Sequence, residues 1–126
     1  MQSIKAEDLA VAITATLNEW ESDKWGKLEQ LAEEKGEELK ERVQRDAPTR
    51  TGKYKRGFKI RKEKDYRKIK VGVYNSSKRA SLMHLLEDGH AKADGGRVDG
   101  IPHLRKNEKE VNEEFYKEAQ KIYESK

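Results

Sequence analysis

The motif DAPTRTGKY, at residues 46–54, opens the stretch of sequence that decides the fold. Pro48 ends the helical pattern before it, because a proline disfavours helix at the residue that precedes it. Gly52, after a threonine, predicts a turn. Two short segments follow in which apolar residues alternate with charged or small ones, and the second ends in VGVY at residues 71–74. Such alternation is typical of strands, so we predict a β-hairpin over residues 52–74.

Charge is distributed unevenly along the chain. Residues 50–70 contain eleven Lys and Arg against two acidic residues, a net of +9, whereas residues 1–49 contain seven basic and twelve acidic residues, a net of −5. Residues 71–126 contain ten of each. The net charge of +4 therefore comes from the hairpin. We expect its outer face to be lined by Lys55, Lys59, Arg61, Lys68 and Lys70.

Three interpretations of this cationic face stay open. It can grip the phosphate backbone of a nucleic acid, so a nucleic-acid-binding protein is the alternative function. It can be a solvated strand face, since edge strands use lysine to prevent unwanted pairing. It can also meet the acidic helical region of a neighbouring subunit, which would favour head-to-tail rings.

The other elements follow from apolar periodicity. Leu9 and Ile13 begin a helical spacing, and we predict a long N-terminal helical region over residues 4–46, bent or broken near Gly26. The chain is expected to be a single α+β domain, residues 1–126, with a small antiparallel sheet. Its other predicted parts are a short helix at 80–88, a glycine-rich loop at 89–104, with or without one short strand, and a C-terminal helix at 105–125, with a capping pattern at Asn107.

The composition limits the kinds of protein that this chain can be. Hydrophobic residues make up 33% and charged residues 41%, against an ordinary charged share of about 25%. We expect such a lean core to complete its burial against other subunits. The absence of cysteine excludes disulfides and thiolate metal sites. No apolar run approaches the roughly 18 residues that span a bilayer, and the N-terminus lacks a signal-peptide core, so no membrane contact is expected.

The sequence contains no complete catalytic or metal-binding motif. A TGK triplet at residues 51–53 resembles part of a phosphate-binding loop but lacks that motif's earlier glycine and its following Ser or Thr. His84, His90 and His103 fit no standard zinc spacing, and nothing places a nucleophile or general base beside them. We predict no catalytic residue, no metal and no cofactor. A small nuclease that uses the histidines is the enzymatic alternative.

Three segments, taken in order, resemble a known family. They are residues 46–54, the HLLEDGHA motif at 84–91, and GGRV at 95–98 running on to PHL at 102–104. They resemble the head–tail joining proteins of bacteriophages with long non-contractile tails and of prophages, which are also labelled minor tail, neck or tail-completion components. The matching positions are expected to define the fold or an interface: Pro48, Arg50, Gly52, Glu87, Gly89, His90, Gly96, Arg97, Pro102 and His103.

The resemblance implies a curved antiparallel sheet packed by helices, and a structural role in the phage neck between the portal–connector stack and the tail tube. It implies a ring-shaped homo-oligomer that contacts connector and tail-tube or tail-terminator proteins. It provides no enzymatic residues. The protein would assemble in the cytoplasm of the bacterial host and end in the virion neck or tail. There its basic residues, Arg97 included, would face DNA or a neighbouring subunit without reading base sequence.

Overall fold

The computed structural model describes residues 11–16, 24–48, 52–65, 68–77 and 83–125, and its α+β class is the one predicted. A three-stranded antiparallel sheet lies at its centre, with β3 between the other two strands. The strands are β1 (Val11–Thr16), β2 (Phe58–Lys64) and β3 (Lys68–Asn75).

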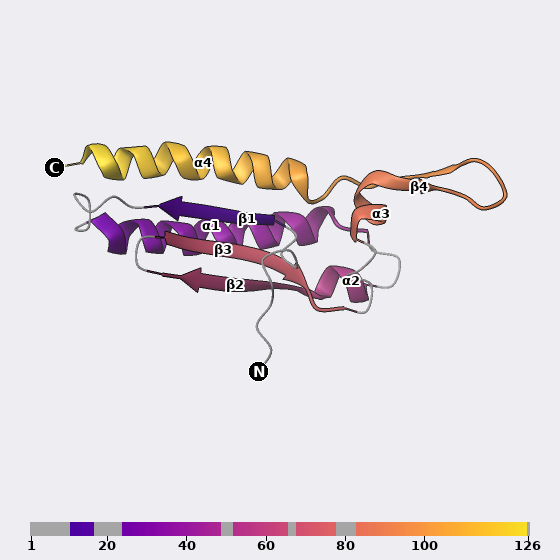
Figure 1. The fold of residues 1–126 in the computed structure, drawn as a ribbon, viewed down its shortest axis with the longest axis horizontal. Coiled ribbons are helices and arrows are strands. Elements are labelled where there is room, and N and C mark those ends of the chain that lie inside the picture. Colours follow the sequence, from indigo (N-terminus) through magenta and orange to yellow (C-terminus); the bar gives the residue numbers. More distant parts are fainter. Residues whose placement is uncertain (1–10, 17–23, 49–51, 66–67, 78–82, 126) are drawn as a thin grey trace.

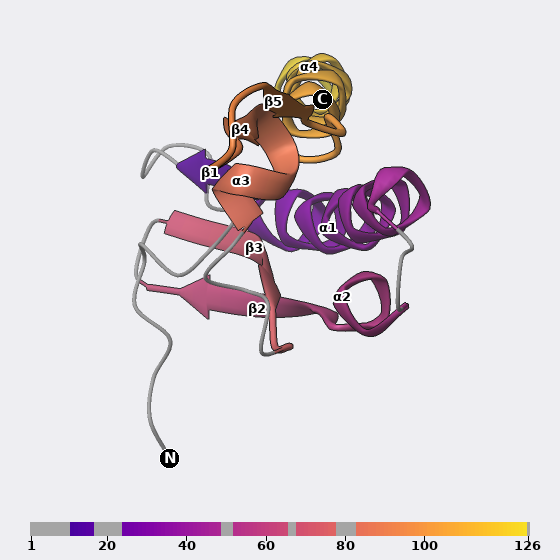
Figure 2. The same cartoon turned by 90° about the vertical axis from the view of Figure 1, so that its right-hand side faces the viewer.

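Two long helices complete the body of the molecule. The helix α1 (Trp25–Asp46) covers one face of the sheet and contacts all three strands, while α4 (Arg105–Glu124) lies along α1 and beside β1 (Figure 1, Figure 2). None of the described helices is long and apolar enough to cross a membrane. The shorter elements are α2 (Lys53–Arg56), α3 (Met83–Asp88), β4 (Gly89–Ala91) and β5 (Arg97–Asp99).

The core lies between the sheet and α1. Alternate residues of a strand share a face, so Ile69, Val71 and Val73 of β3 all point toward the helix and are buried. Gly36 lets α1 approach this strand closely, because a Cβ atom built there would lie 2.2 Å from Val71 Cγ1. The core is completed by apolar residues of every main element, including Ile13, Leu28, Leu39, Val43, Phe58, Val111 and Phe115.

The prediction of helix over residues 4–46 is wrong for residues 11–16. These residues form β1, with Val11 opposite Val73 and Ile13 opposite Val71 on β3. The segment VAITAT is rich in β-branched residues, which favour strands, and its buried positions alternate. Pairing with β1 also satisfies backbone groups on one side of β3, which would otherwise lack partners.

The helix itself is confirmed over Trp25–Asp46. It begins beside Gly26, where a bend or break was predicted, and residues 17–23 lie outside the described residues. The open edge of β1 is covered by α4. There the backbone N–H of Ala12 donates to Glu108 Oε2 at 2.9 Å, and Asn112 Nδ2 donates to the Ala12 carbonyl at 3.1 Å.

The predicted hairpin is confirmed, with one added element. Gly52 has a φ of +75°, the left-handed conformation that suits glycine in a turn. A single helical turn, α2, follows before β2 begins at Phe58. Strand β2 then pairs with β3 along its whole length.

The segment predicted as a glycine-rich loop contains two strands. β4 and β5 pair as an antiparallel hairpin, which we call the arm (residues 89–99), and it projects beyond the rest of the molecule (Figure 1). Gly89 has a φ of +81°, the left-handed geometry predicted for the end of the preceding helix. A pair of strands was not predicted, because glycine and charged residues are depleted in strands and the sequence carries no clear strand pattern here.

Candidate assembly surfaces

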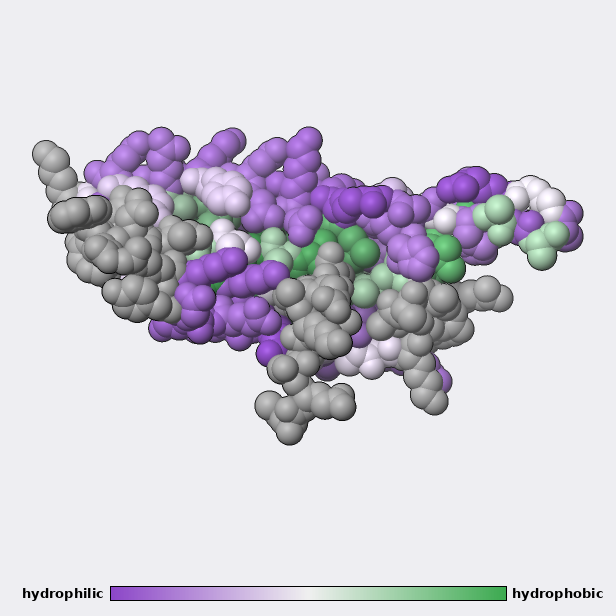
Figure 3. Space-filling view, viewed as in Figure 1, coloured by the Kyte–Doolittle hydropathy of each residue, from purple (hydrophilic) through white to green (hydrophobic). Residues whose placement is uncertain are grey.

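One side of the sheet carries a cationic surface. Strand alternation places Lys59 and Arg61 of β2, and Lys68 and Lys70 of β3, on the face that points away from α1. We call these four residues the basic face, and Figure 3 shows hydrophilic side chains over β2 and β3 on this side. Arg61 pairs with Glu63 at 3.2 Å. The three lysines make no ion pair with any residue that the structure describes.

One residue predicted for the hairpin's outer face lies elsewhere, and Arg97, predicted to face DNA or a neighbouring subunit, lies outside the hairpin. Lys55 is on α2, and its Nζ is 3.4 Å from the Arg45 carbonyl at the end of α1, so it does not belong to the sheet face. Arg97 is on the arm, where its guanidinium donates to the Asp88 carbonyl at 2.7 Å. The basic face therefore lacks Lys55 but keeps the other four residues predicted for it.

Two further lysines of the hairpin point inward, toward α1. Lys62 Nζ lies 2.6 Å from Glu29 Oε1 and also pairs with Glu33, while Lys64 Nζ lies 2.9 Å from Glu29 Oε2. The hydrogen bonds from Lys62 and Lys64 lower the pKa of Glu29. Part of the attraction between the basic hairpin and the acidic helix is thus satisfied within one chain. Extending the strand alternation past Ile60 would have revealed these two lysines in the sequence.

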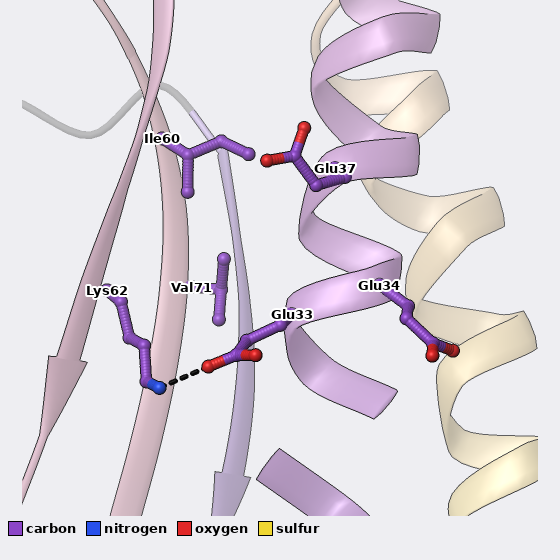
Figure 4. Close-up of a pocket in the computed structure, with 6 residues that line it drawn as sticks. All are labelled: Glu33, Glu34, Glu37, Ile60, Lys62 and Val71. Carbon is purple, nitrogen blue, oxygen red and sulfur yellow. Dashed lines mark hydrogen bonds and ion pairs between the residues drawn. The ribbon is translucent and has the colours of Figure 1, made fainter. Parts of the chain in front are cut away.

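Figure 4 shows the hollow that lies between α1 and β2. Ile60 and Val71 line it from the sheet, and Lys62 reaches across to Glu33 on the helix. Glu34 points away from this pair, along the outer side of the helix. The hollow is therefore bounded by acidic side chains on its helical side.

The exposed surface of α1 is acidic. Glu33, Glu34, Glu37 and Glu41 are all exposed on α1, and we call them the acidic stripe. Glu33 and Glu37 lie at its edge beside β2, where Glu33 pairs with Lys62. Glu37 and Glu41 make no ion pair with any described residue.

The stripe is acidic because two cations of α1 point elsewhere. Lys35 and Arg42 turn toward α4, where both pair with Glu114, at 3.4 and 3.0 Å. Lys40 is half-buried beside the stripe, and the exposed Arg45, four residues after Glu41, pairs with Asp46. Folding therefore separates the charges of α1, leaving carboxylates on the surface that faces outward.

A buried junction holds the base of the arm against α4. The Glu87 carboxylate accepts hydrogen bonds from the backbone N–H groups of His103, Leu104 and Arg105, at 2.6 to 2.9 Å. Burial raises the pKa of Glu87, but these backbone hydrogen bonds outweigh it, so the pKa lies below its usual value. Glu87 thereby caps the first turn of α4.

His103 links this junction to α2. The ring is fully buried, with Nδ1 2.7 Å from the Ile101 carbonyl and Nε2 2.7 Å from the Tyr54 hydroxyl. The carbonyl can only accept, so we assign the proton to Nδ1, and Nε2 accepts from Tyr54. Burial, with the nearby Glu87 carboxylate, holds the pKa of Tyr54 well above its usual range. His103 thus serves as a connector inside the fold.

The other two histidines are not part of this buried junction. His84 and His90 are exposed on α3 and β4. Within the described ranges, no cluster of His, Asp and Glu has the arrangement that would hold a metal ion.

The remaining predicted positions lie around the arm and the turn. Gly96 has a φ of +84° at the tip of the arm. Pro48 is half-buried after α1, and Pro102 is exposed between the arm and α4. Arg50 lies outside the described residues. Their assignment to an interface stays a prediction.

Comparison with known proteins identifies the family. The fold is that of a small two-layer α+β protein with two surfaces of opposite charge. Its residues 12–89, from β1 through α3, match the family model described as "Bacteriophage HK97-gp10, putative tail-component". The chain belongs to this HK97-gp10-like family of phage tail components. The resemblance to phage tail and head–tail proteins is therefore confirmed as membership of a phage tail-component family. Searches of curated proteins and of solved structures found no match.

Proposed function

We propose that this protein is a structural subunit of the phage head–tail connection, in the neck or in tail completion, and that it acts by assembly as a ring without catalysis. Family membership supports a role as a virion component. The proposed partners are further copies of the chain, the connector, and the tail-tube or tail-terminator proteins. Assembly would take place in the cytoplasm of the bacterial host.

The arm is the observation that carries this proposal. A lone two-stranded hairpin is marginally stable in water, and every residue of the arm from His90 to Asp99 is exposed. Its base is nevertheless fixed. The Ile101 N–H donates to the Leu86 carbonyl at 2.9 Å, and a Cβ atom on Gly100 would lie 2.3 Å from the Glu87 carbonyl. A fixed, exposed projection is suited to contact another virion protein.

Two apolar side chains give the arm a testable contact surface. Val98 is 38% exposed and Ile101, at the base, is 47% exposed. We expect the double variant Val98→Asp and Ile101→Asp to bind purified connectors or tail tubes at least about tenfold more weakly, since buried apolar anchors dominate interfaces. Sedimentation and electron microscopy of the mixtures would measure this.

The matched control replaces an exposed apolar side chain of α4 with aspartate. Tyr116 is 58% exposed there, and Tyr116→Asp should bind as the wild type does. Circular dichroism should show all variants folded. Normal binding by the folded arm variant would contradict the role of the arm. A wild-type protein that joins neither connectors nor tails would contradict the proposed function itself.

A nucleic-acid-binding role is the second candidate, and the basic face supports it. Lys59, Lys68 and Lys70 lie on one face and make no ion pair with a described residue, while Glu63, opposite Lys70 on that face, pairs with Arg61. Phosphate contacts of this kind lose affinity steeply as salt rises. Sub-micromolar binding to duplex DNA with that salt dependence would favour this function, and its absence would remove it.

A further inference from the structure

We propose that copies of this chain associate head to tail, with the acidic stripe of one copy against the basic face of the next. This inference rests on the proposed ring assembly and names the surfaces that would form the ring. It concerns contacts between copies, and not those of the arm with other virion proteins.

The two surfaces lie on different faces of the molecule. The helix α1 covers one face of the sheet (Figure 2), and the basic face is the other face. The acidic stripe is on the exposed surface of α1, with Glu33 and Glu37 at the flank beside β2 (Figure 4). Figure 1 looks onto the sheet from the side away from α1, and no described helix lies in front of β2 and β3. A second copy can therefore stack on the first with stripe against basic face, and this contact can repeat.

Folding leaves these particular charges without partners. The inward lysines Lys62 and Lys64 are already paired with α1. By contrast, Glu37 and Glu41 on one side, and Lys59 and Lys70 on the other, have no ion-pair partner in the described parts of the chain. What remains for a partner is a set of carboxylates and a set of ammonium groups on separate faces.

The two surfaces are similar in length. Glu33 and Glu41 are eight residues apart on a helix, which is about 12 Å. Lys59 lies opposite Tyr74 and therefore four residues along β3 from Lys70, which is about 13 Å. Charges on the two surfaces can thus meet along their full length.

Charge also decides the kind of symmetry. An isologous dimer would place the same surface of two copies together, which here means carboxylates against carboxylates or lysines against lysines. Like charges in contact disfavour such pairing. A heterologous contact joins opposite charges, and it closes into a ring when the rotation between copies permits.

Charge reversal tests this contact. We expect Glu37→Lys with Glu41→Lys, and separately Lys59→Glu with Lys70→Glu, to weaken self-association at least about tenfold in sedimentation experiments at low salt. All four substitutions combined in one chain should restore self-association, because the interface is then rebuilt with its charges exchanged.

Mixing the two double variants gives a sharper result. In an alternating arrangement, each contact between the two kinds of chain is complementary, so the mixture should assemble although neither variant does alone. An isologous contact through one surface cannot give this pattern, because one of the two double variants leaves that surface unchanged and would therefore self-associate alone as the wild type does.

Matched controls reverse the same charges on α4. Glu113 and Glu124, and likewise Lys109 and Lys117, are exposed there, and reversing either pair should leave self-association unchanged. Loss in these controls, or no rescue in the mixture, would overturn the proposal. So would duplex DNA binding that the lysine reversals abolish while self-association stays normal.

The outcome can be separated from that of the proposed function. Charge-reversed chains that self-associate normally, beside a wild type that binds connectors or tails, would overturn this interface and leave the neck role standing. A wild-type chain that stays monomeric alone, and that also forms no assembly with connectors or tails, would overturn both this interface and the proposed neck role.

Discussion

At the scale of single residues, Glu87 decides how the last helix begins. A helix N-terminus leaves backbone N–H groups without partners inside the helix, and at α4 these groups meet the Glu87 carboxylate. The sequence assigned this capping role to Asn107. That side chain is instead buried, and it donates to Asp46 Oδ2 at 2.9 Å. The cap comes from a distant residue, which no local pattern could indicate.

Removing the Glu87 carboxylate should therefore be costly. We expect Glu87→Ala to lower the free energy of unfolding by about 2–3 kcal/mol, because buried N–H groups lose their acceptor. Urea unfolding followed by circular dichroism would measure it. The neighbouring Asp88 is exposed and pairs with Arg105, so Asp88→Ala should cost less than about 1 kcal/mol. Equal losses in the two variants would show that Glu87 does not cap α4.

At the scale of elements, the contact between α1 and β3 depends on a missing side chain. Gly36 lies in the middle of α1, where glycine weakens a helix by about 1 kcal/mol relative to alanine. It is buried against Val71. The close approach of helix and strand explains a residue that would otherwise only weaken the helix.

Filling this contact should destabilise the protein. We expect Gly36→Ala to lower the free energy of unfolding by about 1–2 kcal/mol, because overpacking outweighs the gain in helix propensity. Thermal and urea unfolding would measure it, and adding Val71→Ala should cancel part of the overpacking. Gly26 is the matched control. A Cβ atom there meets nothing within 4 Å, so Gly26→Ala should leave stability equal or slightly higher. A stabilised Gly36→Ala protein would contradict the close approach.

At the scale of the whole molecule, carboxylates join the elements. Glu29 joins α1 to β2, Glu87 joins α3 to α4, and Glu114 joins α4 to α1. Asp46 joins the end of α1 to α4 through Asn107, and the pKa of its carboxyl is held well below the usual range by Arg45 and Asn107. The side chains of Glu29 and Glu114 are 22% and 41% exposed, so solvent screens their ion pairs in part, whereas Glu87 is buried.

These pKa directions predict loss of stability in acid. A carboxyl whose pKa is lower in the folded state stabilises the fold above its unfolded pKa, and this stability is lost as the pH falls through the folded pKa. The reference pKa of glutamate is 4.5, and that of Glu87 is lowered from it. We therefore expect the free energy of unfolding to decline below about pH 4.5.

Denaturant unfolding across a pH series would check this expectation. Glu87→Gln should make the decline less steep, since one of the groups that titrate is gone, while Glu29 and Asp46 still contribute. Glu113 is exposed on α4, and Glu113→Gln should leave the pH profile as in the wild type. A Glu87→Gln profile with the wild-type slope would contradict the assignment.

The sequence by itself determined the elements that local patterns define. The helix over residues 25–46, the hairpin and its Gly52 turn, and the C-terminal helix all follow from apolar spacing and turn chemistry within a few residues. The unequal charge of hairpin and helix was equally visible, and so was the resemblance to phage tail proteins. These features need no knowledge of what lies across the fold.

Only the tertiary structure decided the rest. Residues 11–16 fit helical and strand spacing alike, and the presence of β3 beside them made them a strand. The packing of the sheet on α1 turned Lys62 and Lys64 inward and left Lys59 and Lys70 outward. Strand pairing, capping at a distance and the division of charge between inner and outer faces depend on partners far apart in the chain, which only folding brings together.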